Sequence, residues 1–381
     1  MKKTILIFID WYLPGYKAGG PIRSVANIVS HLGDEFNFKI VTKDTDYLES
    51  KPYENIKSNS WNKINENTEV YYFSSNEITK KNIKNIIKKT EFDSLYINGI
   101  YSLYFSILPL YFSKKLNIKN TIVASRGMLS SHAFSQKSKK KKLFLFACKI
   151  IGLYKNTTFH ATNNNEAESI KSIIKTKINV YSIPNLPRKT EIFKQKITTK
   201  EENIIKIVSI ARISDEKNTL FALQQLKTIK TGQIIFDIYG SIYDKNYWQK
   251  CLDIINQLPE NIEVTHKGTI ESENVIKTFS DYHFSFMPSK GENYGHSILE
   301  SFMAGTPVIT SNTTPWRNLE NKKIGWDISL NNSQKFVETI KYCVQMEQDE
   351  YNTWSKNAFD FAKKTTDNTE LLKKYNTMFS H

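Results

Sequence analysis

The sequence predicts an α/β protein made of two doubly wound domains. The chain has 381 residues, enough for two domains with full cores. Short apolar runs that are typical of buried strands alternate with helical patterns in both halves, as in parallel sheets covered by helices. In residues 284–311 a strand, a glycine-containing loop, a helix and a second strand follow one another. Such a unit places a helix N-terminus beside a strand end, where phosphate groups commonly bind.

In the first half, the apolar runs predict a series of strands. A helix follows the first strand over residues 22–32, because apolar side chains recur there at helical spacing. Gly19 and Gly20 precede this helix and allow backbone to approach a ligand, although their spacing is not the G-x-G-x-x-G dinucleotide pattern. The strands are expected at residues 4–9, 38–42, 70–73, 94–97 and 121–125.

The second half begins after a polar and charged stretch that suits a linker. A helix is predicted over residues 296–304, ended by Gly305 and Pro307. Further helices are expected from residues 333 and 350 onward, the last near 367–379. The strands of this half are expected at residues 204–210, 234–239, 284–287 and 308–310.

The composition restricts the class of protein. A formal charge of +15 attracts polyanions, whether nucleic acid, anionic lipid or phosphorylated substrates. The three cysteines are far apart, which argues against a disulfide framework or a zinc site and fits a reducing cytoplasm. Asp10 interrupts the short apolar N-terminal run, which therefore predicts a first strand and not a signal peptide. No apolar run reaches the roughly 18–20 residues that span a bilayer.

The loop and helix of residues 289–304 contain the strongest candidate site. Glu292 lies in the loop, and Glu300 follows eight residues later on the helix. Between them, the backbone N–H groups of Asn293, Tyr294 and Gly295 are expected at the helix start, where they favour an anion. Either glutamate alone could equally be an ordinary solvated charge. Together with the glycine turn and the G-T-P-V-I exit, the pair is much more specific.

Residues 292–309, E-N-Y-G-H-S-I-L-E-S-F-M-A-G-T-P-V-I, resemble the E-x7-E motif of retaining glycosyltransferases of family 4. The usual form is E-G-F-G-x4-E-A-M-A-x-G-x-P-V-I, so Asn293, Ser301 and Met303 depart from it. The resemblance implies the GT-B fold: two Rossmann-like domains facing a cleft, with a C-terminal helix that crosses back to the first. It also implies that Glu292 contacts the donor sugar and Glu300 holds the donor ribose.

Other stretches of the second half resemble the same family. Arg212 and Lys217 match the cations of its G-R-x4-K-G element, which bind the donor diphosphate. The resemblance further implies donor contacts at Gly240 and in the stretch ending at Ile270, whose backbone receives the nucleobase. Without the glutamate motif, the two cations would equally suit a strand end and a helix start.

In the first half, the resemblance assigns Gly19, Gly20 and Arg23 to a loop that faces the cleft, with the two glycines expected to bind the donor and Arg23 expected on the acceptor side. Many members of the family place a histidine after the strand at 121–125, but this chain has Arg126, for which we expect a contact with acceptor or donor phosphate. His160 is expected on the acceptor side, as a packed polar residue more than as a base.

The expected domains are residues 1–190, a linker at 191–203, a nucleotide-sugar domain at 204–360 and a returning helix at 361–381. Asp44-Thr45-Asp46 has the D-x-D form of the metal motif of a different glycosyltransferase fold. It lacks the context of that motif, so no metal and no cofactor are expected. The lysine-rich run at 137–142, followed by apolar residues 143–148, fits either a solvated loop before a core helix or a contact with an anionic membrane.

The predicted function is retaining, metal-independent transfer of a sugar from a nucleotide diphosphate sugar to a hydroxyl of a glycan or lipid-linked acceptor in surface polysaccharide synthesis. The expected location is the cytoplasm, at the inner face of the membrane. A sugar-nucleotide epimerase or hydrolase on the same scaffold is one alternative. A nucleic-acid-binding protein is another, but the five arginines are dispersed among loops instead of clustered with aromatic residues, so no nucleic-acid partner is expected.

Overall fold

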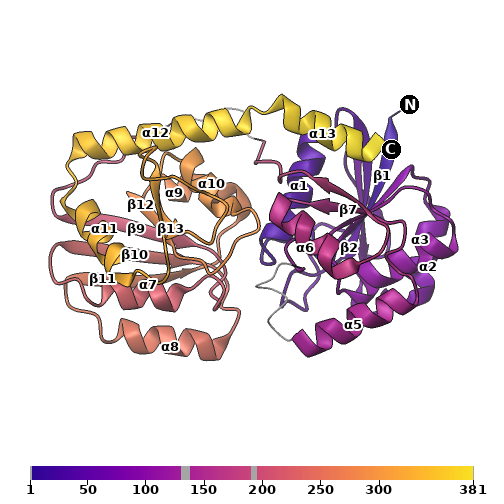
Figure 1. The fold of residues 1–381 in the computed structure, drawn as a ribbon, viewed down its shortest axis with the longest axis horizontal. Helices are drawn as coiled ribbons and strands as arrows, with labels where there is room; N and C mark the ends of the chain where they lie inside the picture. Colours follow the sequence, from indigo (N-terminus) through magenta and orange to yellow (C-terminus); the bar gives the residue numbers. More distant parts are fainter. Residues whose placement is uncertain (1, 130–137, 190–194, 381) are drawn as a thin grey trace. The chain divides into compact units, whose positions relative to one another are not determined.

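The computed structural model describes residues 2–129, 138–189 and 195–380, and divides the chain into two compact units (Figure 1). Unit 1 combines the chain up to Lys189 with the segment from Asn368 onward, and unit 2 comprises Thr190–Asp367. Each unit is a sheet covered by helices on both faces. No helix in the described part of the chain is long and apolar enough to cross a membrane.

Unit 1 is built on an eight-stranded sheet in the order β3-β4-β2-β1-β5-β6-β7-β8, parallel except for the edge strand β3. β1 lies between β2 and β5, so the strand order reverses there, and this is the switch point at which doubly wound sheets bind ligands. The strands are β1 (Lys3–Phe8), β2 (Phe36–Lys43), β3 (Trp61–Asn65), β4 (Thr68–Phe73), β5 (Ser94–Asn98), β6 (Thr121–Ala124), β7 (Thr158–Ala161) and β8 (Asn179–Ser182).

The helices of unit 1 bury both faces of this sheet. Ile5 and Ile7 of β1 pack in one core with α1 and α13, whereas Leu6 and Phe8 pack in a second core with α2, α3, α5 and α6. This burial on both faces explains the continuous apolar run of β1. The helices are α1 (Gly20–Leu32), α2 (Lys80–Lys89), α3 (Leu108–Lys115), α5 (Ser138–Ile150), α6 (Asn164–Ile174) and α13 (Thr369–Ser380).

Unit 2 contains a six-stranded sheet, entirely parallel, in the order β11-β10-β9-β12-β13-β14. Its switch point lies between β9 and β12. The strands are β9 (Ile204–Ile210), β10 (Gln233–Tyr239), β11 (Ile262–Gly268), β12 (Phe284–Met287), β13 (Val308–Ser311) and β14 (Gly325–Ile328). The helices are α7 (Thr219–Leu226), α8 (Lys245–Ile255), α9 (Val275–Phe279), α10 (His296–Met303), α11 (Ser333–Gln345) and α12 (Gln348–Thr366).

The boundaries of the units differ in two places from those expected. Residues 195–203, expected in the linker, bond to unit 2: the Lys200 N–H donates to Gln348 at 2.7 Å and the Thr198 hydroxyl to the Ser280 carbonyl at 2.8 Å. The returning segment starts at Asn368, because α12 continues through Thr366. Residues 190–194 of the expected linker lie outside the described residues.

Candidate functional site

The loops after β9 and β12 meet at the switch point of unit 2. Lys217, at the end of the first loop, forms an ion pair with Glu292 of the second, with 2.6 Å between Nζ and Oε1. The Ser289 hydroxyl donates to the same carboxylate oxygen at 2.8 Å. The two charged side chains are 17% and 15% exposed, so they are screened less than surface charges but remain reachable from solvent. Residues 75 positions apart in the chain thus form one polar site.

Backbone contacts hold these two loops in register. Asn218 has a φ of 62° and donates from its amide to the Pro288 carbonyl at 3.0 Å. The Lys290 N–H donates to the Glu216 carbonyl at 2.8 Å, and the Lys290 ammonium pairs with Asp215 at 2.6 Å. Asn tolerates the left-handed region better than most residues, so it can replace the glycine expected at this position. The relative placement of Lys217 and Glu292 is therefore set by the backbone.

The turn after Glu292 ends at Gly295, which caps α10 with a φ of 79°. A Cβ at Gly295 would lie 3.0 Å from Nε1 of Trp316 and 3.2 Å from Cδ1 of Ile298, so both conformation and space require glycine. Trp316 donates from Nε1 to the Tyr294 carbonyl at 2.7 Å. Among the described residues, no backbone carbonyl accepts from the N–H groups of Tyr294 or Gly295. These groups are thus available to an anion at the start of α10.

Glu300 lies on α10 and is 6% exposed. Its neighbours Leu299 and Phe302 pack in the core between α9, α10 and α12. Ser301, one of the departures from the family motif, donates its hydroxyl to the Thr306 carbonyl at 2.7 Å and lies 2.9 Å from the Ser285 hydroxyl. A serine is accommodated in place of alanine because its hydroxyl donates to one buried carbonyl and its oxygen can accept from the Ser285 hydroxyl. Met303 is buried in the same core.

Of the remaining residues expected at the donor, Arg212 has no carboxylate partner in the described ranges, whereas Gly240 and Ile270 have packing roles. The Arg212 guanidinium lies 5.6 Å from the centre of the Tyr243 ring, and no carboxylate in the described ranges pairs with it. Gly240 has a φ of 148°, and a Cβ there would lie 1.9 Å from the Ala211 carbonyl oxygen. Gly240 therefore allows the ends of β9 and β10 to approach closely. Ile270 is half-buried and packs against the core that contains α10.

In unit 1, Arg126 is the centre of an internal hydrogen-bond network. It donates from Nε to the side-chain oxygen of Asn98 at 2.7 Å, from one terminal nitrogen to Asn185, and from the other to the Tyr96 hydroxyl at 2.7 Å. Its φ of 50° lies in the left-handed region, which an arginine adopts at a cost. The planar fork thus ties β5 and the segment after β8 to the loop that follows β6.

His160 continues this network inside the core of unit 1. Its ring is 1% exposed, with Nδ1 accepting from the Tyr96 hydroxyl at 2.8 Å and Nε2 donating to the Ile183 carbonyl at 2.9 Å. Burial, together with the charge of Arg126, lowers the pKa of His160 to about 3, so the ring is neutral at physiological pH. The structure gives His160 an internal positioning role and leaves almost none of its surface for an acceptor.

Glu166 is a buried carboxylate that the sequence did not single out. Its two oxygens accept from the hydroxyls of Ser125 and Thr162, from the Gly127 N–H at 2.6 Å and from the Thr162 N–H at 2.8 Å. Burial opposes the charge, but these four bonds outweigh it and lower the pKa of Glu166. Asn163, the N-cap of α6 three residues earlier, accepts from the Glu166 N–H. This capping pattern is the sequence signal that could have identified a structural carboxylate.

The Gly19-Gly20 loop follows β1 and opens α1. Gly19 has a φ of 72°, whereas nothing lies within 4 Å of a Cβ added at either glycine, so the backbone here is open to a ligand. Arg23 is half-buried one turn into α1. Asp46 of the D-x-D sequence orders the loop, because its carboxylate accepts from the N–H groups of Tyr16 and Lys17 at 2.9 and 3.2 Å. Among the described residues no cluster of three or more metal-ligating side chains occurs.

The lysine-rich run expected at 137–142 is described only in part. Lys137 and the side chains of residues 138–141 lie outside the described residues. The backbone of the run from residue 138 onward belongs to α5 (Ser138–Ile150), and Cys148 is buried against the core.

Comparison with known proteins finds a family match in the second half of the chain. Residues 189–361 match the family described as Glycosyl transferases group 1. A curated relative, an uncharacterized 41.2 kDa protein in the cps region of Klebsiella pneumoniae, is 21% identical over 263 residues, which cover 67% of this chain and 70% of the relative.

Two solved structures share the fold over the whole chain. Sucrose-phosphate synthase from Thermosynechococcus elongatus superposes with a TM-score of 0.74 at 13% identity, over 100% of this chain and 98% of that protein. Anabaena HepE in complex with UDP-glucose superposes with a TM-score of 0.69 at 14% identity, over 100% of both chains. These likenesses show the GT-B fold.

Proposed function

The chain is a nucleotide-sugar glycosyltransferase with the GT-B fold, belonging to the glycosyl transferases group 1 family through residues 189–361, and from this premise we propose how it acts. The proposed reaction is transfer of a sugar, with retention at the anomeric carbon and without a metal, to a hydroxyl of a glycan or lipid-linked acceptor. The observation that carries the proposal is the Lys217–Glu292 pair at the switch point of unit 2, beside the N-terminus of α10.

In the proposed mechanism, the bond between the anomeric carbon and the diphosphate breaks as the acceptor oxygen bonds to that carbon. Negative charge develops on the leaving diphosphate, where Arg212, Lys217 and the N–H groups of Tyr294 and Gly295 stabilise it. Glu292 orients the sugar hydroxyls and Glu300 the ribose. The acceptor proton passes to an oxygen of the leaving phosphate, so no side chain is needed as a base.

We infer the nucleobase of the donor and the class of acceptor from similar proteins and from the net charge of the chain. HepE was solved with UDP-glucose, which makes UDP-sugars the first donors to test. The location of the Klebsiella pneumoniae relative in a cps region favours a role in surface polysaccharide synthesis. The charge of +15 suits phosphorylated substrates, and we place the enzyme in the cytoplasm at the inner face of the membrane.

The test is a calorimetric and thermal-shift screen of the full chain against UDP, GDP, ADP, CMP and their sugar conjugates, with and without EDTA. We expect one nucleoside diphosphate to bind regardless of chelator. Glu300→Ala should chiefly weaken that binding, and Arg212→Ala should chiefly slow transfer. Binding of none of these nucleotides, or wild-type turnover by both variants, would overturn the site. Release of free sugar without any acceptor would favour the hydrolase alternative.

A further inference from the structure

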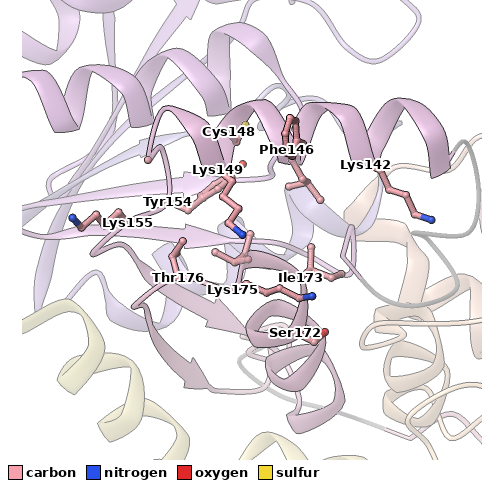
Figure 2. Close-up of a pocket in the computed structure, with 13 residues that line it drawn as sticks. Lys142, Phe146, Cys148, Lys149, Tyr154, Lys155, Ser172, Ile173, Lys175 and Thr176 are labelled. Atoms are coloured by element: carbon pink, nitrogen blue, oxygen red, sulfur yellow. The ribbon is translucent and has the colours of Figure 1, made fainter.

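A hollow of about 300 Å³ lies in unit 1 between α5, the turn that follows it and the end of α6 (Figure 2). Its apolar lining includes Leu145, Phe146 and Ile173. Four lysines line it as well: Lys142, Lys149, Lys155 and Lys175. In Figure 2, Lys149 extends from α5 toward the turn that carries Lys175. None of the residues proposed for sugar transfer lines this hollow.

The positive charge of the hollow is not neutralised by nearby carboxylates. All four lysines are exposed, and no described carboxylate pairs with any of them. A fifth cation, Lys114, donates to the Lys155 carbonyl, and burial together with the charge of Lys155 lowers its pKa. Lysines that line one hollow, with no carboxylate paired to them in the described part of the chain, give it a positive potential that attracts anionic groups such as phosphate.

The outer face of α5 beside the hollow is apolar. Leu143, Phe146 and Ile150 are 69%, 61% and 70% exposed, and they are spaced three and four residues apart, so they form one stripe. Ile151 extends the stripe into the following turn and is 65% exposed. The opposite face of α5 is anchored in the core by Cys148. Four large apolar side chains side by side in water indicate a binding surface.

We propose that the stripe and the lysine-lined hollow form a docking surface for an anionic phospholipid bilayer. Leu143, Phe146, Ile150 and Ile151 enter the boundary between headgroups and acyl chains, while the lysines bind lipid phosphates. Lysines next to exposed Leu, Phe and Ile side chains combine the two residue types through which surface helices bind anionic bilayers. The proposal deepens the membrane location given under the proposed function, on which it rests, and does not depend on the identity of the donor.

Charge complementarity and shape favour a bilayer over the other polyanion, nucleic acid. The surface contains lysines and no arginine, and its exposed apolar residues are three aliphatic side chains and one phenylalanine. A nucleic acid would bind the lysines but leave the aliphatic stripe in water, whereas a bilayer satisfies both. The lysines and the apolar stripe together therefore fit a lipid bilayer.

The test is flotation of the full chain with phosphatidylcholine vesicles that contain or lack phosphatidylglycerol. We expect binding only to the anionic vesicles, weakened by added salt. Each lysine near such a surface contributes roughly fivefold in affinity, so Lys149→Gln with Lys175→Gln should lower partitioning roughly 25-fold. The matched control is Lys88→Gln with Lys89→Gln at the exposed end of α2, which removes the same charge and should have a much smaller effect.

A second measurement uses a dye at position 146 to report whether the apolar stripe enters the bilayer. The three native cysteines are buried, so Phe146→Cys provides one reactive thiol for a polarity-sensitive dye. We expect the dye to report an apolar environment when anionic vesicles are added, while the same dye at Lys88→Cys stays in water. An unchanged signal at position 146, equal losses in both lysine pairs, or oligonucleotide binding that depends on Lys149 and Lys175 as strongly would overturn the proposal. Unchanged nucleotide binding in all variants separates this outcome from a failure of the transferase assignment.

Discussion

The two units share the order of six parallel strands, to which unit 1 adds β3 and β8, but they use the carboxyl ends of these strands differently. In unit 2, the switch point between β9 and β12 holds Lys217 and Glu292, which are in contact and still accessible. In unit 1, polar residues of β5 and of the segments after β6 and β8 are bonded to one another inside the domain, where Arg126 donates to Asn98, Asn185 and Tyr96. The same topology therefore presents charge to a ligand in one unit and organises its own loops in the other.

The largest expected effect is on catalysis in unit 2. Lys217→Ala removes one of the cations that stabilise charge on the leaving diphosphate, so kcat should fall roughly 100- to 1,000-fold. Steady-state kinetics with the donor identified by the nucleotide screen measures this loss. Because the side chain is partly exposed, the free energy of unfolding should change much less than the rate.

Lys290→Ala is the matched control for this prediction. Lys290 belongs to the same loop as Glu292 and pairs with Asp215, but Asp215 is 62% exposed and the pair is screened by solvent. We expect kcat within a few fold of wild type. A similar loss in both variants would mean that loop order, and not the charge of Lys217, controls the rate.

The next effect is on the stability of unit 1. Arg126→Ala removes three hydrogen bonds to buried partners, so the free energy of unfolding should fall by about 2–4 kcal/mol in urea titrations. Arg126→Lys should lose nearly as much, since a lysine cannot reproduce the planar fork. If both variants unfolded like wild type but lost turnover, Arg126 would contact substrate directly and the contrast between the units would disappear.

Much of this fold could be predicted from the sequence because its strands are buried on both faces. Continuous apolar runs such as that of β1 follow from parallel packing between two helical layers, as the two cores on either side of Ile5 and Leu6 show. The edge strand β3 was missed, because its residues are mostly exposed and lack an apolar pattern. The start of the returning segment was misplaced because α12 continues without a helix-breaking residue before Asp367.

The site was predictable where motif spacing and topology coincide. Lys217 and Glu292 were expected in one site, and the loops that carry them meet because β9 and β12 are neighbours. The roles of Trp316 and Asp46 could not be read from spacing, because each depends on a backbone group distant in sequence. Gly240 was expected at the donor because of the family resemblance. The structure shows that packing alone requires a glycine there, because the backbone of Ala211 leaves no room for a side chain.

Glu166 provides a pH test of the internal network in unit 1. Its lowered pKa means that the folded state favours the carboxylate, so this contribution is complete above the ordinary carboxyl pKa and is lost as pH falls through the folded value. Glu166→Gln should cost about 1–3 kcal/mol of unfolding free energy at neutral pH, and the difference from wild type should shrink in acid. Glu168→Gln, exposed on the same helix, is the control. A difference that stays constant with pH would show that the charge of Glu166 does not stabilise unit 1.

The smallest effect concerns the part of unit 1 that is open to a ligand. Gly20 begins α1 with nothing within 4 Å of an added Cβ, so Gly20→Ala should leave stability unchanged or raise it by about 0.4–1 kcal/mol. Gly19→Ala should instead lower stability by about 1 kcal/mol, because Gly19 has a φ of 72°. If substrate approaches the backbone at Gly20, the added methyl group raises KM without loss of stability, which unfolding and kinetic measurements on one preparation can separate. An unchanged KM would leave unit 1 without a substrate contact at this loop, and the acceptor would have to be sought elsewhere.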